Sequence, residues 1–191
     1  MAKAARKPAS AITRAHPLEG RRVKGKGAVA TPADPARRMS LRAPAASIAA
    51  LSKALGVKLP QQPKTSAISR DGARAALWLG PDEWLVIDTG EGDPMADRAG
   101  VRALHSAVDI SHRNTAIVVG GVNAAAALNA GCPQDLSLSA FPAGACSRTV
   151  FGKAEIVLWR TEENTFRVEC WRSFSDYVFT FLEDAARDAG A

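Results

Sequence analysis

The stretch from residue 108 to residue 177 decides the fold, and it reads VDISHRNTAIVVGGVNAAAALNAGCPQDLSLSAFPAGACSRTVFGKAEIVLWRTEENTFRVECWRSFSDY. It has two halves, each running from a strand pattern to a helix pattern, with a Gly/Pro-marked loop between them. In the second half, strands are expected over 146–151, 154–159 and 166–171. Over 166–171, apolar side chains alternate with polar or aromatic ones, as in a strand with one buried face. A polar turn at 161–164 joins the last two strands.

A long C-terminal helix should follow these strands. Ser173 and Asp176 are spaced as a capping pair. An apolar stripe at i, i+3, i+4, i+7, i+8 and i+11 predicts a face that packs on a sheet; its members are Phe174, Tyr177, Val178, Phe181, Leu182 and Ala185.

In the first half, residues 108–119 predict one long strand that Gly120-Gly121 breaks. Asn123 is the expected cap of a short helix that ends near residues 129–130. Earlier in the chain, a helix is expected over 45–56 with Gly56 as its C-cap, a loop over 60–71, a hairpin from 74–79 to 84–88, and a helix over 95–104. Strand pairs covered by separate helices define an α+β fold, with antiparallel sheet and helices packed on it.

The charge is divided unevenly along the chain. The net charge of +6 combines +9 in residues 1–42, which hold eleven Lys/Arg and two acidic residues, with −3 in residues 43–191. Because residues 1–42 also contain few large apolar side chains, we expect a disordered basic N-terminal tail there and a single folded domain over 43–191. Such a tail can bind nucleic acid, an acidic membrane or an acidic partner, and its Arg-rich, acid-poor composition also occurs in transit peptides.

Two further features bear on where the protein works. No apolar run approaches the roughly 20 residues of a membrane span, and the N-terminus lacks the apolar region of a secretory signal. The three cysteines, Cys132, Cys146 and Cys170, are odd in number and fit neither a disulfide framework nor paired metal ligands. We expect reduced, half-buried thiols in a cytoplasmic protein.

Several motifs are candidates for sites of chemistry. Gly120-Gly121 lies between a strand and a helix but lacks phosphate-loop spacing, which favours a structural turn over anion binding. Asp109, Ser111 and His112 are neighbours on the expected strand, and three such residues cannot form a nucleophile–base–orienter chain. The histidines are scattered, and the carboxylate pairs lie in turns. We therefore expect no catalytic, cofactor-binding or metal-binding residue in this chain.

What remains is a set of aromatic and cationic side chains. Of the four tryptophans, Trp78, Trp84 and Trp159 are expected in the core, whereas Trp171 lies opposite the apolar face of its strand and beside an arginine. The cations Arg113, Arg148, Lys153, Arg160 and Arg172 are either solvated or locally paired, or they form a partner surface or bind an anion. The candidate subunit interface therefore consists of Ser111, His112, Arg113, Arg148, Lys153, Trp171 and Arg172.

Five segments in this order resemble the gamma subunit of heterotetrameric sarcosine oxidase. They are LGPDEWLVID (79–88), VDISHRNTAIVV (108–119), NAGCPQDL (129–136), FPAGACSRTVFGKAEIVLWR (141–160) and FRVECWRSFSDYV (166–178). Each is short, and their joint order and spacing make the match specific. The resemblance covers about residues 74–185 and leaves the basic tail out.

The resemblance implies a fold similar to the folate-binding domain of glycine-cleavage T-proteins. It also implies partners, namely the alpha, beta and delta subunits of a complex that oxidises sarcosine to glycine with oxygen, gives hydrogen peroxide and passes the one-carbon unit to tetrahydrofolate as 5,10-methylenetetrahydrofolate. In that family FAD, FMN, NAD, tetrahydrofolate and zinc are associated with the partner subunits, and the gamma subunit is not known to hold a cofactor.

Three functional hypotheses follow. The first is a non-catalytic subunit that supports assembly of the oxidase. The second, of a different class, is a module that binds folate or another anionic small molecule through Arg113, Arg148 or Lys153, and it rests on fold analogy alone. The third, nucleic-acid binding by residues 1–42, ranks last because no aromatic residues are interleaved with the basic ones.

Overall fold

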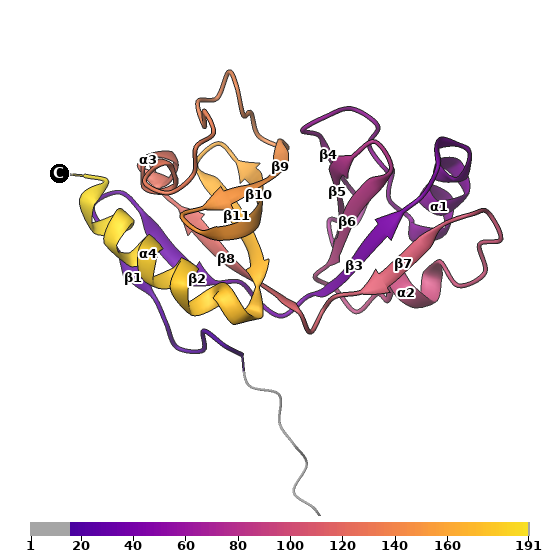
Figure 1. Cartoon of the computed structure of the whole chain (residues 1–191), viewed down its shortest axis with the longest axis horizontal. Coiled ribbons are helices and arrows are strands. Elements are labelled where there is room, and N and C mark those ends of the chain that lie inside the picture. The colour runs from indigo at the N-terminus through magenta and orange to yellow at the C-terminus, as the bar shows by residue number, and fades with distance from the viewer. Residues whose placement is uncertain (1–15, 191) are drawn as a thin grey trace, which may run out of the picture.

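In a computed structural model, which describes residues 16–190, the chain forms two antiparallel sheets that lie side by side (Figure 1). The six-stranded sheet has the order β1 (Val23–Lys24), β2 (Val29–Pro32), β8 (Asn114–Gly120), β11 (Thr165–Trp171), β10 (Ala154–Glu162) and β9 (Cys146–Phe151). The five-stranded sheet has the order β4 (Ser66–Ile68), β5 (Arg74–Gly80), β6 (Glu83–Asp88), β3 (Arg37–Arg42) and β7 (Ser106–Asp109). The expected α+β fold with antiparallel sheets is confirmed.

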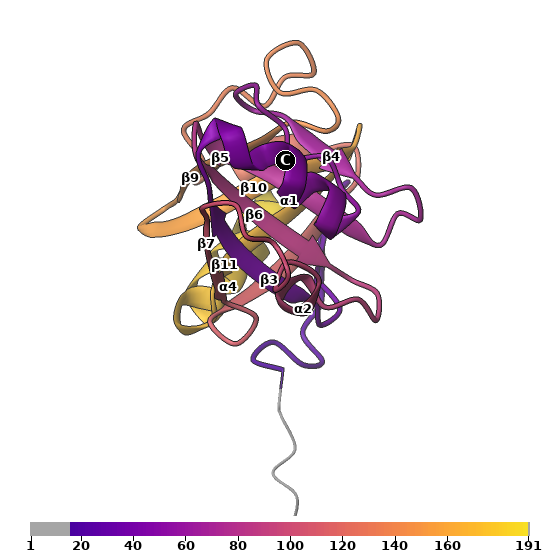
Figure 2. The ribbon, with the colours of Figure 1, turned by 90° about the vertical axis from the view of Figure 1, so that its right-hand side faces the viewer.

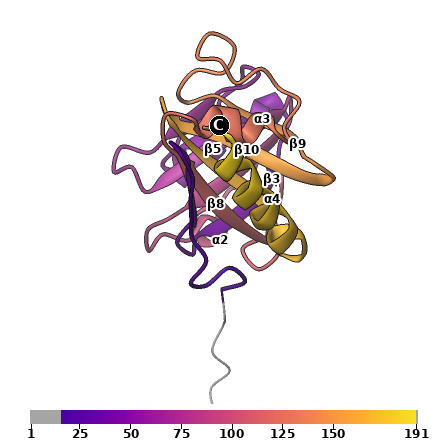
Figure 3. The same cartoon turned by 90° about the vertical axis from the view of Figure 1, so that its left-hand side faces the viewer.

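Helices cover the outer face of each sheet. Helices α3 (Ala124–Asn129) and α4 (Ser175–Asp188) pack on the six-stranded sheet, where Leu128 and Phe179 meet Ile117 and Phe166. Helix α1 (Ile48–Leu55), preceded by the turn η1 (Ala45–Ser47), packs on the five-stranded sheet beside the short α2 (Pro94–Asp97). Figure 2 looks onto the α1 and α2 side, and Figure 3 looks onto the α4 side.

The inner faces of the two sheets form a core of their own. Leu77, Leu85 and Ile87 of the five-stranded sheet pack with Val157 and Trp159 of the six-stranded sheet. The molecule therefore has four layers, in the order helix, sheet, sheet, helix, and any group on an inner face is either in this core or at its open rim.

The expectation of a disordered tail over residues 1–42 is wrong from residue 16 onward, whereas residues 1–15 lie outside the described part. Strand β2 pairs with β8, and β3 lies between β6 and β7 in the middle of its sheet. Among the apolar residues of this segment, Leu18, Met39 and Leu41 are fully buried. Basic residues of this segment also form ion pairs with acidic residues that are distant in the sequence: Arg21 pairs with Asp176 and Glu183 of α4. The composition of the segment does not reveal such pairs.

Gly25 marks where this N-terminal segment contacts α4. A Cβ atom at Gly25 would lie 1.7 Å from the backbone oxygen of Ala186. We expect Gly25→Val to push the β1–β2 hairpin off the helix and to lower the free energy of unfolding by about 1–3 kcal/mol, as overpacking does. Urea denaturation measures this. Gly100→Ala is the matched control, because its added Cβ meets nothing within 4 Å; equal loss in both variants would contradict the contact.

The expected strand over 108–119 is in fact two strands in different sheets. The backbone N–H groups of Arg113 and Asn114 both donate to the Ile110 oxygen, so the chain turns at 110–113 between β7 and β8. The expected helix over 95–104 ends at Asp97, and the expected loop over 60–71 contains β4. The sequence pattern alone could not reveal that the chain passes from one sheet to the other here, because the apolar residues on both sides of the turn also fit a single strand.

The hairpin β5–β6 and the strands β9, β10 and β11 are confirmed, as is α1 with Gly56 in the left-handed conformation (φ 64°) as its C-cap. Asn123 is the N-cap residue of α3 as expected, but its side chain makes no capping hydrogen bond and instead donates to the Lys26 oxygen. The expected cap of α4 is wrong. Helix α4 follows a helical turn, η2 (Arg172–Phe174), and Asp176 binds Arg21 rather than capping the helix with Ser173.

The apolar stripe expected on α4 is only partly buried. Val178 and Leu182 are in the core, and Phe179, which falls outside the expected stripe, is fully buried beside them. Phe174 and Tyr177, the first two members of the stripe, are exposed. They lie at the start of the helix, and this places two aromatic rings on the surface beside Trp171.

Candidate functional site

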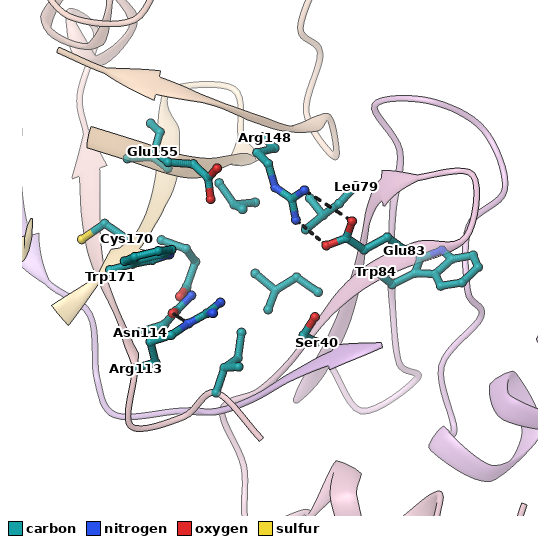
Figure 4. A pocket seen from close by; sticks show the side chains of 15 residues that line it. Ser40, Leu79, Glu83, Trp84, Arg113, Asn114, Arg148, Glu155, Cys170 and Trp171 are labelled. Atoms are coloured by element: carbon teal, nitrogen blue, oxygen red, sulfur yellow. Dashed lines mark hydrogen bonds and ion pairs between the residues drawn. The ribbon is translucent and has the colours of Figure 1, made fainter. Parts of the chain in front are cut away.

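A small cavity opens at the rim of the inter-sheet core (Figure 4). On one side lie Trp171, Arg113 and Asn114 from the end of β11 and the start of β8, and on the other lie Glu83 and Trp84 from β6. Its volume is about 60 Å³, which suits a few water molecules and not a cofactor. Leu85, Ile110 and Val157 line it where it meets the core between the sheets.

Arg148 spans this cavity from β9 to β6. Its guanidinium makes a two-pronged ion pair with Glu83, with one Nη1–Oε2 distance of 3.3 Å. Glu83 raises the pKa of Arg148, so the arginine stays charged and its charge is compensated. Arg148 therefore joins the two sheets and is not free to bind an anion.

A buried charge cluster lies nearby, deeper between the sheets. Glu169 of β11 accepts from Arg38 Nε of β3 at 2.6 Å and from Arg167 Nε at 2.8 Å. All three side chains are nearly or fully buried, and Arg38 also donates to the Ala36 oxygen. Sequence reasoning missed this cluster. The one available signal was a charged residue at each alternate position of an otherwise apolar strand.

The structure places Ser111, His112 and Arg113 in the turn between the sheets and not on a strand. The hydroxyl of Ser111 accepts from the Arg38 backbone N–H at 2.8 Å, and its own backbone N–H donates to Asp109. His112 is exposed in the same turn. The expectation that Asp109, Ser111 and His112 are neighbours on one strand is therefore wrong. The hydrogen bonds of Ser111 give it a structural role, because they fix the turn to β3.

The expected cationic set does not form one surface. Arg160 is buried, donates to the backbone oxygens of Leu136, Phe141 and Glu163, and lies 4.6 Å above the Phe166 ring. It therefore has local partners, one of the expected alternatives, and is neither solvated nor available to a partner. Lys153 is exposed in the β9–β10 turn and does not line the cavity. Arg172 starts η2, where its backbone N–H donates to the Arg113 oxygen.

The charges around the cavity do not favour an anionic ligand. Arg113 and Arg148 line it together with Glu83, Glu155 and Glu169. Glu83 compensates Arg148, and Glu169 is held by the buried Arg38 and Arg167. The remaining lining charges, Arg113 and Glu155, are opposite in sign, so the cavity has little net positive charge to attract a folate tail or a phosphate. This cavity therefore offers no support for the hypothesis of an anion-binding module.

Trp171 begins an exposed aromatic cluster that the structure assembles from three consecutive elements, β11, η2 and α4. We call Trp171, Phe174 and Tyr177 the aromatic ridge; these side chains are 40%, 43% and 41% exposed. The expected exposure of Trp171 is confirmed, and Phe174 and Tyr177 were missed because the helical stripe assigned them to the core. Trp84 and Trp159 are buried as expected.

The three cysteines are free and buried, and among residues 16–190 no group of three His, Cys, Asp or Glu side chains is arranged to hold a metal ion. Burial raises the pKa of both the Cys146 and the Cys170 thiol to about 12. Buried, protonated thiols are unreactive, which excludes Cys146 and Cys170 as nucleophiles at neutral pH.

These two thiols predict a loss of stability in alkali. Between about pH 9 and pH 12 the unfolded chain loses thiol protons that the folded chain keeps, so the free energy of unfolding falls as pH rises through this window. Urea denaturation from pH 7 to pH 11 measures it. We expect the Cys146→Ala/Cys170→Ala variant to be less stable at pH 7 but to decline less above pH 9; an identical alkaline decline would rule out the thiols as its source.

The architecture defines a class of protein: a two-sheet α+β domain with helices on the outer face of each sheet and a buried charge cluster between the sheets. The match to a protein-family model makes the particular family plain. Residues 40–188 match the sarcosine oxidase, gamma subunit family, and the chain belongs to that family.

Relatives and solved structures agree with this assignment. The chain is 36% identical over 141 residues to the sarcosine oxidase gamma subunits of Corynebacterium sp. (strain P-1) and Arthrobacter sp., matching 72% of this chain and 68% of each relative. A chain of the heterotetrameric sarcosine oxidase from Corynebacterium sp. U-96, solved with pyrrole 2-carboxylate, superposes with a TM-score of 0.83 at 28% identity, over 93% of this chain and 97% of that chain.

The aminomethyltransferase T of the glycine cleavage system from Bartonella henselae shares the fold alone. It superposes with a TM-score of 0.61 at 13% identity, over 86% of this chain and 50% of that chain. The expected likeness to T-proteins is confirmed at the level of fold. Among the described residues, no helix is both long and apolar enough to cross a membrane.

Proposed function

We propose that this chain is a gamma subunit of a heterotetrameric sarcosine oxidase and that it supports assembly of the complex without contributing a catalytic residue. The observation that carries the proposal is the family match over 40–188, together with a superposition that spans 97% of the heterotetrameric oxidase chain. A chain that matches a subunit over nearly its whole length has room for the same contacts with neighbouring subunits.

The chemistry of the described residues supports the non-catalytic part of this proposal. A general acid or base needs a titratable group within reach of substrate. Here Glu169 is sealed between two arginines, Glu83 is paired with Arg148, and the cavity beside them is too small for a cofactor.

The proposal includes the rest of the complex. The partners are alpha, beta and delta subunits in the cytoplasm, and they hold FAD, FMN, NAD, tetrahydrofolate and zinc. The whole complex oxidatively demethylates sarcosine to glycine with oxygen and tetrahydrofolate, giving hydrogen peroxide and 5,10-methylenetetrahydrofolate.

Co-expression tests the assembly role. The untagged chain is expressed with tagged candidate partner subunits encoded beside it, and native mass spectrometry identifies what co-purifies. We expect a stoichiometric complex that contains flavin. We also expect the complex prepared without this chain to be less stable or to lose flavin or turnover. A complex that keeps full stability, flavin content and turnover without the chain would refute an assembly role.

A further inference from the structure

The aromatic ridge is the most conspicuous surface feature that the fold leaves unexplained. Trp171 and Phe174 stand 6.0 Å apart between ring centroids, and Tyr177 follows one turn later on α4. Buried aromatic rings dominate core and interface energetics, and exposed clusters of them mark interaction sites. Each ring of the ridge leaves about two fifths of its surface to solvent, so the fold alone does not account for three neighbouring aromatic residues here.

Contacts from neighbouring elements hold the ridge in place. The Arg113 guanidinium lies 5.1 Å above the Trp171 ring. At the other end, the Tyr177 hydroxyl accepts from the Lys153 backbone N–H at 3.1 Å, and its ring contacts Phe181, which in turn packs on Phe151. Rings that are already ordered lose little conformational entropy on binding, which is a property of effective interface anchors.

Positive charge flanks the ridge at both ends. Arg113 lies at the Trp171 end and Lys153 at the Tyr177 end, and within residues 16–190 neither side chain has a carboxylate at ion-pair distance. Asp176 of α4, which is next to Tyr177 in the sequence, is paired with Arg21. Glu155 lines the cavity with Arg113 but makes no ion pair with it. The ridge thus presents aromatic rings between two cations.

This arrangement favours one kind of occupant. In a symmetric contact between two copies of this chain, the same patch would face itself and bring cations from both copies together, which costs energy. A different chain with an apolar hollow and carboxylates at its edges would bury the rings and pair both cations. Aromatic and arginine side chains are also the residues most enriched at the energetic centres of protein interfaces.

We propose that the aromatic ridge, with Arg113 and Lys153, is the docking surface through which this chain binds another subunit of the oxidase, and that the partner's face is an apolar hollow edged by carboxylates. This inference rests on the proposed function, because it takes the partner from the same complex. Beyond that function, the inference specifies which face of the chain contacts the partner and which chemical groups the partner presents to it.

The experiment is co-expression of the full chain with the other subunits, one of which carries the tag, followed by native mass spectrometry of the purified complex over a dilution series. In the test variant, Trp171→Ser/Phe174→Ser, we expect retention to fall at least tenfold. The matched control, Leu104→Ser/Val122→Ser, removes two apolar side chains that are 78% and 76% exposed elsewhere, and it should be retained as the wild type is. Circular dichroism melting of each isolated chain checks folding.

A second pair of variants decides the matter should the ring variant fold poorly. Arg113→Glu/Lys153→Glu reverses the flanking charges and should weaken retention at least tenfold, more so at low salt, whereas Lys58→Glu/Arg70→Glu reverses two other exposed charges and should not. Wild-type retention of both the ring variant and the Arg113/Lys153 variant would overturn the docking surface and leave the proposed function standing. A wild-type chain that does not co-purify would overturn both. A dimer of the isolated chain that the ring variant abolishes would assign the ridge to a second copy instead.

Discussion

Glu169→Ala should lower the free energy of unfolding by about 3–5 kcal/mol, because it leaves two arginines buried without their shared carboxylate. Glu169 is nearly fully buried and accepts from Arg38 and Arg167, which belong to different sheets. A loss of this size is a large part of the 5–15 kcal/mol that stabilises most domains. Urea denaturation measures it, and the variant should also bind a hydrophobic dye as the sheets separate.

Three further variants separate charge from packing. Glu162→Gln changes an exposed carboxylate on the neighbouring strand and should cost almost nothing. Replacing the whole cluster, as Arg38→Met/Glu169→Leu/Arg167→Met, should recover much of the stability that Glu169→Leu alone loses, because no charge is then left unpaired. Should the triple variant be less stable than the single one, the cost would lie in shape and not in the unpaired charges.

Arg160→Ala should also cost about 3–5 kcal/mol, because the buried guanidinium satisfies three backbone oxygens at once. The oxygens of Leu136 and Phe141 belong to the long connection between α3 and β9, and that of Glu163 belongs to the β10–β11 turn. Hydrogen bonds to a charged donor contribute about 1.5–3 kcal/mol each, and the buried oxygens would lose their partner. Chemical denaturation measures the loss.

The effect should be local as well as global. In Arg160→Ala, amide hydrogen exchange over residues 130–145 should become faster than exchange in the strands of the two sheets, because Arg160 holds this connection against β10 by hydrogen bonds. Arg160→Lys keeps the charge but not the fork of donors, so it should recover only part of the stability. Arg187→Ala removes an exposed arginine on α4 and is the control; similar losses in Arg160→Ala and Arg187→Ala would contradict the anchoring role.

The sequence identified elements best where local chemistry is strong. The β5–β6 hairpin has Gly80-Pro81-Asp82 at its turn, α1 ends at a glycine, and β11 alternates apolar side chains with polar or aromatic ones. It failed where one pattern has two physical explanations. A run of apolar residues over 108–119 fits one strand or two, and only the turn at 110–113 shows that β7 and β8 belong to different sheets.

The candidate site divides in the same way. Trp171 was expected on the surface because it lies on the face of its strand opposite Phe166, Val168 and Cys170. Arg167 and Glu169 share the Trp171 face and are buried, so alternation alone does not decide the exposure of Trp171. The exposure of Phe174 and Tyr177 could not be predicted from the sequence. Helical spacing shows that they share an apolar stripe, but it does not show where the sheet beneath the helix ends. The different environments of Arg148 and Arg160 could not be predicted either, because both are arginines on neighbouring strands. Arg148 bridges the two sheets by its ion pair with Glu83, whereas Arg160 is buried and binds backbone carbonyl oxygens.

The sequence by itself determined the α+β class, most strands, the final helix and the family resemblance, because these depend on neighbouring residues and on the order of motifs. Only the tertiary structure decided that residues 16–42 supply strands to both sheets, that Arg38, Glu169 and Arg167 meet between them, and that the aromatic ridge lies outside the core. The physical reason is that burial and charge pairing join residues more than a hundred positions apart, as Arg38 and Glu169 are. The composition of a segment does not contain that information.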